Sequence, residues 1–276
     1  MKTGKPILLA ADGPISLDLT LRSGQVFHWD KRADGSWTGL IDETPVRVSE
    51  KDGFLQVAEE SATLAGNYFS LDHPLEEIYS RFPSDPMSAE ALALCRGLRI
   101  IRQPRWECLA TFVTSSMKQV AHIRSMSLAL RRTFGRPTKF GCTYPSPERV
   151  ADLDEEALRA CGLGYRARNL LGTARMVAGG EADLDALGGL ETPALREALV
   201  KLPGVGAKVA NCVLLFAYER LDAVPIDVWI HRVLIAMRRG RGGTASQLAR
   251  YARKNLGLYA GYVQQYLFHR ARVSSK

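Results

Sequence analysis

The hydrophobic periodicity of this chain changes once along its length, and this change constrains the fold more than any other sequence feature. Between residues 16 and 58, short stretches of alternating apolar and polar residues are separated by the turn dipeptides Asp34-Gly35 and Asp52-Gly53. After about residue 70, apolar residues recur at the spacing of a helix. The sequence therefore predicts an N-terminal antiparallel sheet, with strand candidates at residues 17–29, 36–41, 45–50 and 54–59.

Helix caps, first-turn prolines and glycine stops delimit the rest of the chain. Ser146 precedes Pro147, Gly162 is typical of a helix end, and residues 244–247 form a capping box. Helices are predicted at residues 74–81, 87–97, 105–115, 119–134, 147–152, 155–161, 166–178, 193–201, 207–218, 228–238 and 245–255. The predicted fold class is α+β, with an antiparallel sheet domain and its first helix at residues 1–82 and an all-helical body at residues 83–276.

Composition indicates in which compartment the protein is expected and whether it crosses a membrane. The chain has 276 residues, 46% of them hydrophobic, which is enough to bury a core. The longest apolar stretch, residues 209–218, is too short to cross a bilayer, so no membrane partner is expected. The five cysteines form neither a C-x-x-C pair nor a metal-ligand cluster: Cys95, Cys108, Cys142, Cys161 and Cys212. We expect reduced thiols, no bound metal and a cytoplasmic location, on the nucleoid if the organism is bacterial.

Positive charge is concentrated in the last quarter of the chain. Residues 201–276 contain thirteen Lys and Arg against three acids, a net charge of +10, whereas the whole chain carries +8. Residues 1–200 therefore carry about −2. This asymmetry is consistent with a polyanion partner, and equally with a solvated basic face.

The sequence Leu-Pro-Gly-Val-Gly at residues 202–206 connects two predicted helices in a unit spanning about residues 194–218. Gly204 and Gly206 flank Val205, and the absence of side chains lets successive backbone N–H groups point outward. With the N-terminus of the next helix, these groups favour binding of a phosphodiester. An ordinary helix–helix turn has the same composition, so the hairpin alone leaves both interpretations open.

Lys208 lies in the first turn of the helix that follows this hairpin, among apolar residues. Its charge opposes the helix macrodipole and its neighbours remove solvation, and both effects favour the neutral amine. A neutral amine is a nucleophile near pH 7, so catalysis would explain this lysine. The alternative is a lysine whose stem is buried and whose ammonium reaches solvent.

Asp227 favours the catalytic interpretation. A helix over residues 207–218 is roughly 18 Å long, and the nine residues 219–227 span about 30 Å when extended. The chain can therefore return along the helix and place Asp227 beside Lys208. Asp227 is also the expected N-cap of the next helix, a structural role compatible with the first.

Together these features resemble the helix-hairpin-helix Gly/Pro…Asp superfamily of base-excision DNA glycosylases, in particular a microbial-type member of its 8-oxoguanine branch. The resemblance covers nearly the whole chain. It is carried, in family order, by SGQVFHW (23–29), YFSLDHPLEEIY (68–79), RQPRWECL (102–109), GLGYRAR (162–168), LPGVGAKVANC (202–212) and YAGYVQQYLF (259–268).

The resemblance implies an enzyme with glycosylase and lyase activities. In the family the lysine, here Lys208, attacks C1′ of the damaged nucleotide and forms a Schiff base that allows β-elimination. The aspartate, here Asp227, stabilises the developing positive charge. No cofactor is implied. The implied partner is double-stranded DNA containing 8-oxoguanine, bound by a monomer.

Base recognition is assigned by the same resemblance, after the lesion has been flipped from the duplex. The Gly24 carbonyl would accept a hydrogen bond from N7 of 8-oxoguanine. Phe268, on a C-terminal base-recognition helix, would stack on the base, and Cys212 would pack on the other face. Gln264 would read the Watson–Crick edge.

The residues expected to face the opposite base depart from the family pattern. Tyr165 and Arg166 match residues that fill the vacated space and contact the orphaned base. Met117 and His122 stand where an asparagine and an arginine usually contact the opposite cytosine, so relaxed opposite-base selectivity is expected.

A second departure concerns a local DNA contact. Trp229 and Ala271 replace a histidine and an aspartate of the family. Two alternatives to the main interpretation remain: the same scaffold acting on another lesion, and a non-catalytic helix-hairpin-helix protein that only binds DNA. The second gives Lys208 and Asp227 no reason to occur together.

Overall fold

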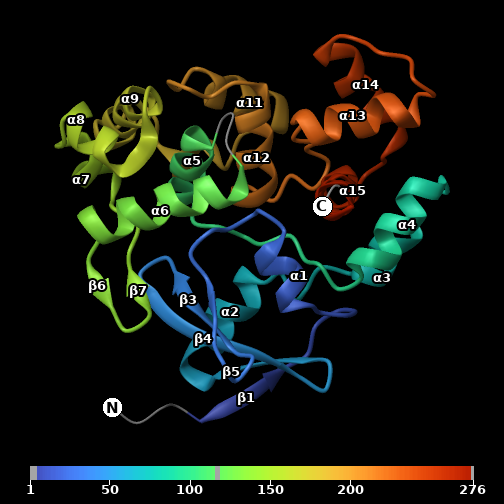
Figure 1. Cartoon of the computed structure of the whole chain (residues 1–276), viewed down its shortest axis with the longest axis horizontal. Coiled ribbons are helices and arrows are strands. Elements are labelled where there is room, and N and C mark those ends of the chain that lie inside the picture. Colours follow the sequence, from blue (N-terminus) through green and yellow to red (C-terminus); the bar gives the residue numbers. More distant parts are fainter. Residues whose placement is uncertain (1–4, 116–118, 275–276) are drawn as a thin grey trace.

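The computed structural model describes residues 5–115 and 119–274, and it contains an antiparallel sheet followed by a helical body. In Figure 1 the sheet lies at the lower side of the molecule and most of the helices lie above it. The predicted α+β class is confirmed.

The N-terminal sheet has five strands that are all antiparallel, in the order β1-β5-β4-β3-β2. Three of them match predicted strands closely. The exceptions are β1, which the sequence reading did not assign and which pairs with β5, and the two-residue β2. The bounds are β1 Pro6–Leu9, β2 Asp30–Lys31, β3 Trp37–Ile41, β4 Thr44–Lys51 and β5 Phe54–Ala58.

The strand predicted at residues 17–29 is wrong, because its first part forms the helix α1 (Leu17–Arg22). The alternation of this segment fits a strand, but Leu17 and Leu21 are also spaced four apart, and both are buried. Ser16 caps the helix by accepting a hydrogen bond from the Leu19 N–H at 3.4 Å. Helical structure also resumes earlier than expected, with α2 (Ala62–Tyr68) packed on the sheet.

The remaining helices follow the predicted order, and α9 and α14 have the predicted bounds. α10 and the ribbon of β6 (Pro137–Thr138) and β7 (Gly141–Cys142) were not expected. The helices are α3 Leu75–Ser80, α4 Pro86–Cys95, α5 Arg105–Thr114, α6 Val120–Phe134, α7 Pro147–Ala151, α8 Glu155–Leu158, α9 Arg166–Ala178, α10 Leu184–Leu187, α11 Thr192–Val200, α12 Ala207–Ala217, α13 Val228–Met237, α14 Ala245–Asn255 and α15 Ala260–Val273.

The core consists of two clusters of buried apolar side chains. The smaller cluster lies between the sheet and helices α1 and α2. The larger cluster fills the helical body, where α5 packs against both α9 and α12. Leu75 and Ile78 of α3 belong to the larger cluster, so this helix shares its core with the helical body. The division at residues 82 and 83 stays a prediction.

A buried ion cluster connects the sheet domain to the helices that hold the site. Glu107 of α5 accepts a hydrogen bond from Arg131 of α6 and lies 3.2 Å from Nδ1 of His28. All three side chains are buried, and burial lowers the pKa of His28 well below its usual range. The cluster therefore fixes α5, which ends beside the candidate site.

Arg131→Met is expected to lower the free energy of unfolding by about 3 kcal/mol, because it leaves the Glu107 carboxylate buried without its cationic partner. Urea denaturation followed by circular dichroism measures this change. Arg132→Met, at the exposed next position of the same helix, serves as the control and should change stability by less than about 0.5 kcal/mol. Equal effects of the two substitutions would contradict the assigned role.

Candidate active site

A glycine hairpin between α11 and α12 forms one wall of the candidate site. Leu202 and Val205 are buried and anchor the hairpin, whereas Gly204 and Gly206 are exposed. Gly204 has a φ of 77°, a conformation that favours glycine. Gly206 is the N-cap of α12 and supplies no side chain to cap the helix. The first-turn N–H groups of α12 therefore lie next to an open, glycine-lined surface suited to an anion.

Lys208 stands in the first turn of α12 with its amine close to two side chains from another part of the chain. Its Nζ lies 3.4 Å from Oγ of Ser115 and 5.1 Å from the ring centroid of Phe112. Cys212, one helical turn further along α12, has a buried thiol whose pKa the charge of Lys208 lowers against the larger effect of burial. The Lys208 side chain is half-buried, and its contacts lead into the protein. These contacts hold the amine at the end of α5.

Asp227 caps α13, as the sequence predicts, and the charge of Lys208 acts on its carboxyl. Its Oδ1 accepts a hydrogen bond from the Ile230 N–H at 2.9 Å. Burial raises the pKa of the Asp227 carboxyl, although N–H groups of the cap and the charge of Lys208 oppose this shift. No ion pair within 4.0 Å joins the two residues in the described chain. The Lys208 amine and the Asp227 carboxyl therefore interact electrostatically without forming an ion pair.

The predicted base-reading residues come from the loop after α1 and from α12 and α15. Gly24 has a φ of 85°, and a Cβ at this position would lie 3.4 Å from Cε1 of Phe268. Gln264 is only 4% exposed, and its Oε1 has no hydrogen-bond partner among the described residues. Cys212 is also buried, and burial raises the pKa of its thiol. The structure thus brings Gly24 to Phe268 and Cys212 to Lys208.

The residues predicted to face the opposite base are only partly described. Tyr165 is 59% exposed, and its ring centroid lies 4.4 Å from Cζ of Arg166, which is buried. His122 is exposed near the start of α6. Trp229 is half-buried in the first turn of α13, two residues after Asp227. Met117 lies outside the described residues.

Sequence reasoning missed several residues that shape the site. Ser115 and Phe112 contact the Lys208 amine from a helix about ninety positions earlier in the chain. Gln265 of α15 donates to the Ser23 carbonyl at 3.0 Å and so holds the loop that carries Gly24. No local sequence pattern predicts these contacts, because each joins segments that are far apart in the chain. Only the order of the family motifs indicated that these segments lie close together in the fold.

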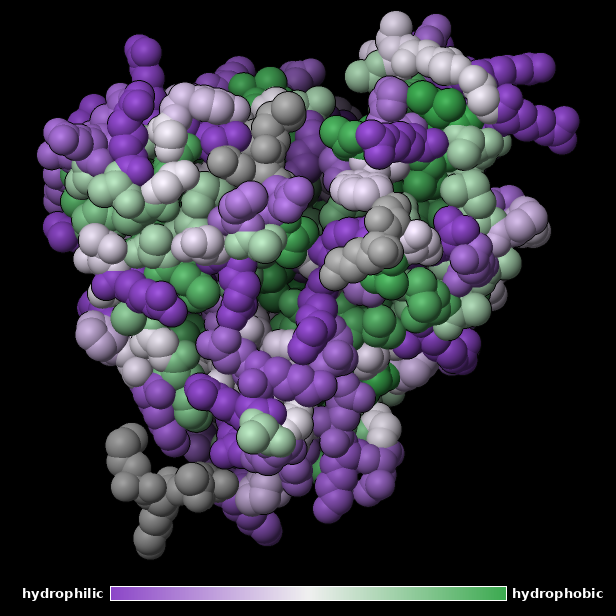
Figure 2. Space-filling model, in the orientation of Figure 1, coloured by the Kyte–Doolittle hydropathy of each residue, from purple (hydrophilic) through white to green (hydrophobic). Residues whose placement is uncertain are grey.

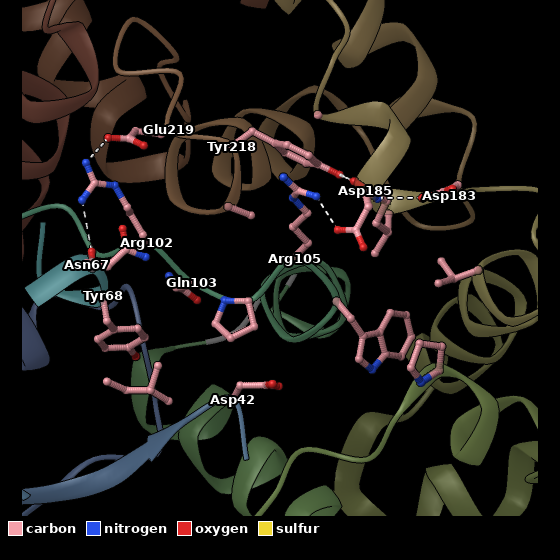
Figure 3. A pocket seen from close by; sticks show the side chains of 18 of the residues that line it. Asp42, Asn67, Tyr68, Arg102, Gln103, Arg105, Asp183, Asp185, Tyr218 and Glu219 are labelled. Atoms are coloured by element: carbon pink, nitrogen blue, oxygen red, sulfur yellow. Dashed lines mark hydrogen bonds and ion pairs between the residues drawn. The ribbon is translucent and has the colours of Figure 1, made fainter. Parts of the chain in front are cut away.

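An open cavity of about 1110 Å³ lies away from Lys208, at the N-terminal end of α5 and the C-terminal end of α12. Figure 3 shows Arg102 and Arg105 reaching into it from neighbouring positions. Arg102 forms a two-pronged ion pair with Asp72, and Arg105 pairs with Asp185. Since α12 is eleven residues long, this cavity is roughly 15 Å from the first turn. We therefore assign the site from the side-chain chemistry around Lys208 and not from cavity size.

Within residues 5–115 and 119–274, no group of three or more His, Cys, Asp or Glu side chains is arranged to hold a metal ion. No helix in the same ranges has the length and apolar character needed to cross a bilayer.

Comparison with known families matches the two parts of the chain separately. Residues 7–109 match the N-terminal domain of 8-oxoguanine DNA glycosylase. Residues 111–257 match the HhH-GPD superfamily base excision DNA repair protein family.

Individual proteins are similar over almost the full length. A probable N-glycosylase/DNA lyase of Methanothermobacter thermautotrophicus is 30% identical, with 95% of each chain covered. The solved structure of MBOgg1 with a low-affinity DNA ligand has a TM-score of 0.93 at 31% identity, covering 100% of this chain and 98% of the other. The 8-oxoguanine glycosylase/lyase of Clostridium acetobutylicum, in complex with DNA containing cytosine opposite 8-oxoG, has a TM-score of 0.89 at 25% identity, covering 96% and 94%.

Proposed function

The chain belongs to the HhH-GPD superfamily of base excision DNA repair proteins, and on this premise we propose that it excises 8-oxoguanine from duplex DNA and nicks the strand. The observation that carries the proposal is the amine of Lys208, held against Ser115 and Phe112 next to an open glycine hairpin, together with the electrostatic interaction between Lys208 and Asp227. A protein that only binds DNA has no use for this pair. The family and its named relatives support an N-glycosylase that is also a DNA lyase.

In the proposed reaction Lys208 supplies the nucleophile. Its nitrogen forms a bond to C1′ while the bond from C1′ to N9 of the base breaks, and the base leaves with the bonding electrons. The nitrogen then loses a proton, and its lone pair forms the C1′=N bond while the C1′–O4′ bond breaks and O4′ takes up a proton. The product is a protonated Schiff base with the opened sugar. Removal of a C2′ proton breaks the bond between C3′ and its phosphate oxygen, which nicks the strand. The ionised Asp227 stabilises the positive charge that develops on the sugar.

The base is read in an extrahelical position. The Gly24 carbonyl accepts a hydrogen bond from N7–H, a donor that 8-oxoguanine has and guanine lacks. Phe268 stacks on one face of the base and Cys212 packs on the other. The unpaired Oε1 of buried Gln264 supports its proposed role, because a buried acceptor gains a partner when the Watson–Crick edge arrives.

Phosphate contacts hold the duplex. The hairpin and the first turn of α12 bind one phosphate of the damaged strand. Figure 2 shows hydrophilic side chains projecting from the lobe of α13 and α14 at the upper right. The exposed basic residues there fit a second contact with the DNA backbone: Arg232, Arg239, Arg241, Arg250, Arg253 and Lys254. We expect the enzyme to act as a monomer in the cytoplasm.

Relaxed opposite-base selectivity is expected because the sequence has Met117 and His122 at the positions that usually contact cytosine. Single-turnover excision of 8-oxoguanine opposite C, A, G and T should vary by no more than about tenfold, since each lost contact contributes roughly 1–3 kcal/mol of discrimination. The variant His122→Arg should increase the preference for cytosine. A steep preference for cytosine in the unaltered protein would contradict this expectation.

The experiment that tests the function uses one duplex with a single 8-oxoguanine opposite cytosine and a second duplex with guanine at the same position. Release of the oxidised base and a nick at its position, with no cleavage of the undamaged duplex, support the proposal. Binding of both duplexes without cleavage of either would favour a DNA-binding protein without this activity. Parallel duplexes with other damaged purines test the same scaffold acting on another lesion.

A further inference from the structure

Three side chains on α15 form a stripe along one face of the helix. Gln264, Phe268 and Arg272 are spaced four residues apart, so consecutive members are roughly 6 Å apart along the axis. Phe268 lies in the middle, and Gln264 and Arg272 lie at the two ends. A purine stacked on Phe268 therefore has the Gln264 amide near one edge and the Arg272 guanidinium near the opposite edge.

Arg272 is held in place by contacts that occupy only part of its guanidinium. Its Nη2 donates to the Arg22 carbonyl, and its Cζ lies 5.5 Å from the ring centroid of Phe268. Its Nη1 is buried and has no hydrogen-bond partner among the described residues. The same Nη1 lies 3.1 Å from the point where a Cβ on Gly24 would stand. A buried N–H donor beside Gly24 is therefore left without an acceptor, which is costly unless a ligand supplies one.

We infer that Arg272 is a specificity-determining residue, whose Nη1 donates a hydrogen bond to the O8 oxygen of the flipped base. This inference rests on the proposed function. It places an N–H donor next to the Gly24 carbonyl, so that the protein presents one donor and one acceptor side by side. The ligand class is a purine that carries a carbonyl at C8 and a hydrogen at N7.

The chemistry of oxidation explains why such a pair is useful. Oxidation of guanine adds the acceptor O8 at C8 and converts N7 from an acceptor into a donor. The Gly24 carbonyl would accept from N7–H and Arg272 would donate to O8, so the two contacts complement two adjacent changes. Guanine has only a C–H at C8, so it offers the Arg272 donor no acceptor at that position. Because the donor is charged, its hydrogen bond is of the stronger kind.

The test compares Arg272→Leu with the unaltered enzyme in two reactions. Leucine keeps an apolar contact with Phe268 and removes the donor. We expect single-turnover excision of 8-oxoguanine opposite cytosine to fall about ten- to a hundredfold, as for loss of a hydrogen bond to a charged group. Cleavage of a preformed abasic site opposite cytosine should change by less than about twofold, because that substrate has no base. Arg272→Lys, which keeps a donor, should recover part of the excision rate.

Arg270→Leu is the matched control, because Arg270 lies on the same helix but forms its ion pair with Glu90 of α4. It should excise 8-oxoguanine at nearly the unaltered rate. Three results with Arg272→Leu would overturn the inference. The first is an unchanged rate of excision, and the second is faster excision, which would mean that the Arg272 side chain obstructs the base. The third is an equal fall in excision and in abasic-site cleavage, which would indicate a lost phosphate contact or misfolding. If the unaltered enzyme fails to excise the base, the proposed function itself is wrong and the inference falls with it.

Discussion

Lys208→Gln is expected to abolish covalent trapping of the protein on DNA and to lower base excision by on the order of a thousandfold or more, as for removal of a catalytic nucleophile. Borohydride reduces a Schiff base to a stable amine, so it links the unaltered enzyme to a duplex containing one 8-oxoguanine. Glutamine is similar in length to lysine and cannot form a Schiff base. The amount of protein–DNA adduct on a denaturing gel, and the rate of base release, measure the two effects.

Two controls separate catalysis from binding and folding. Lys201→Gln removes an exposed lysine just before the hairpin and should trap normally. Binding of Lys208→Gln to the same duplex should be retained, because the hairpin N–H groups remain. If the unaltered enzyme releases the base without forming an adduct, the glycosylase activity stands and Lys208 needs another role. Trapping by Lys208→Gln at the normal level would exclude Lys208 as the nucleophile.

The parts of the fold that depend on local signals could be predicted from the sequence. The capping box at Thr244 marks the start of α14, because the Thr244 and Gln247 side chains satisfy each other's backbone N–H groups. Gly162 ends a helical segment with a φ of 82°. In contrast, the alternation of apolar residues at 17–21 predicts a strand, whereas the Ser16 cap and the burial of Leu17 and Leu21 on one face make this segment the helix α1. β1 was missed because its pairing partner, β5, lies about fifty residues away.

In the candidate site, too, the sequence predicts the local contacts and does not predict the long-range ones. The hairpin, Lys208 and Asp227 lie within one short segment, so chain lengths alone indicate that they can meet. Ser115 reaches Lys208 across 93 positions of sequence, and Arg272 reaches the Arg22 carbonyl across 250. Their contacts depend on how α5 and α15 pack, which no local pattern encodes. Family resemblance identified Phe268 and Gln264, and the packing then identified Arg272, whose guanidinium lies against both the Gly24 loop and Phe268.

Asp227→Asn is expected to lower excision by about a hundredfold or more, because it removes the negative charge that stabilises the sugar cation. Asparagine is as good an N-cap as aspartate, so α13 keeps its cap and the Ile230 N–H keeps its acceptor. Asp227→Ala removes both functions and should additionally lower the free energy of unfolding by about 1 kcal/mol. Single-turnover excision and urea denaturation of the two variants separate the catalytic role from the capping role. Equal losses of stability in both variants, or normal excision by Asp227→Asn, would contradict this division.

The pH dependence of stability gives an independent check on Asp227. Burial raises its pKa in the folded protein above that in the unfolded chain, so the unfolded chain loses its proton first as the pH rises. The ionised carboxyl therefore costs stability at neutral pH, and this cost disappears as the pH falls through the folded-state pKa towards the unfolded value. Asp227→Asn should be more stable than the unaltered protein at pH 7, and this advantage should shrink towards pH 4. If Asp227→Asn is more stable than the unaltered protein by the same amount at pH 7 and pH 4, ionisation of the Asp227 carboxyl does not cost stability. The position of Asp227 would then not be a compromise between stability and catalysis.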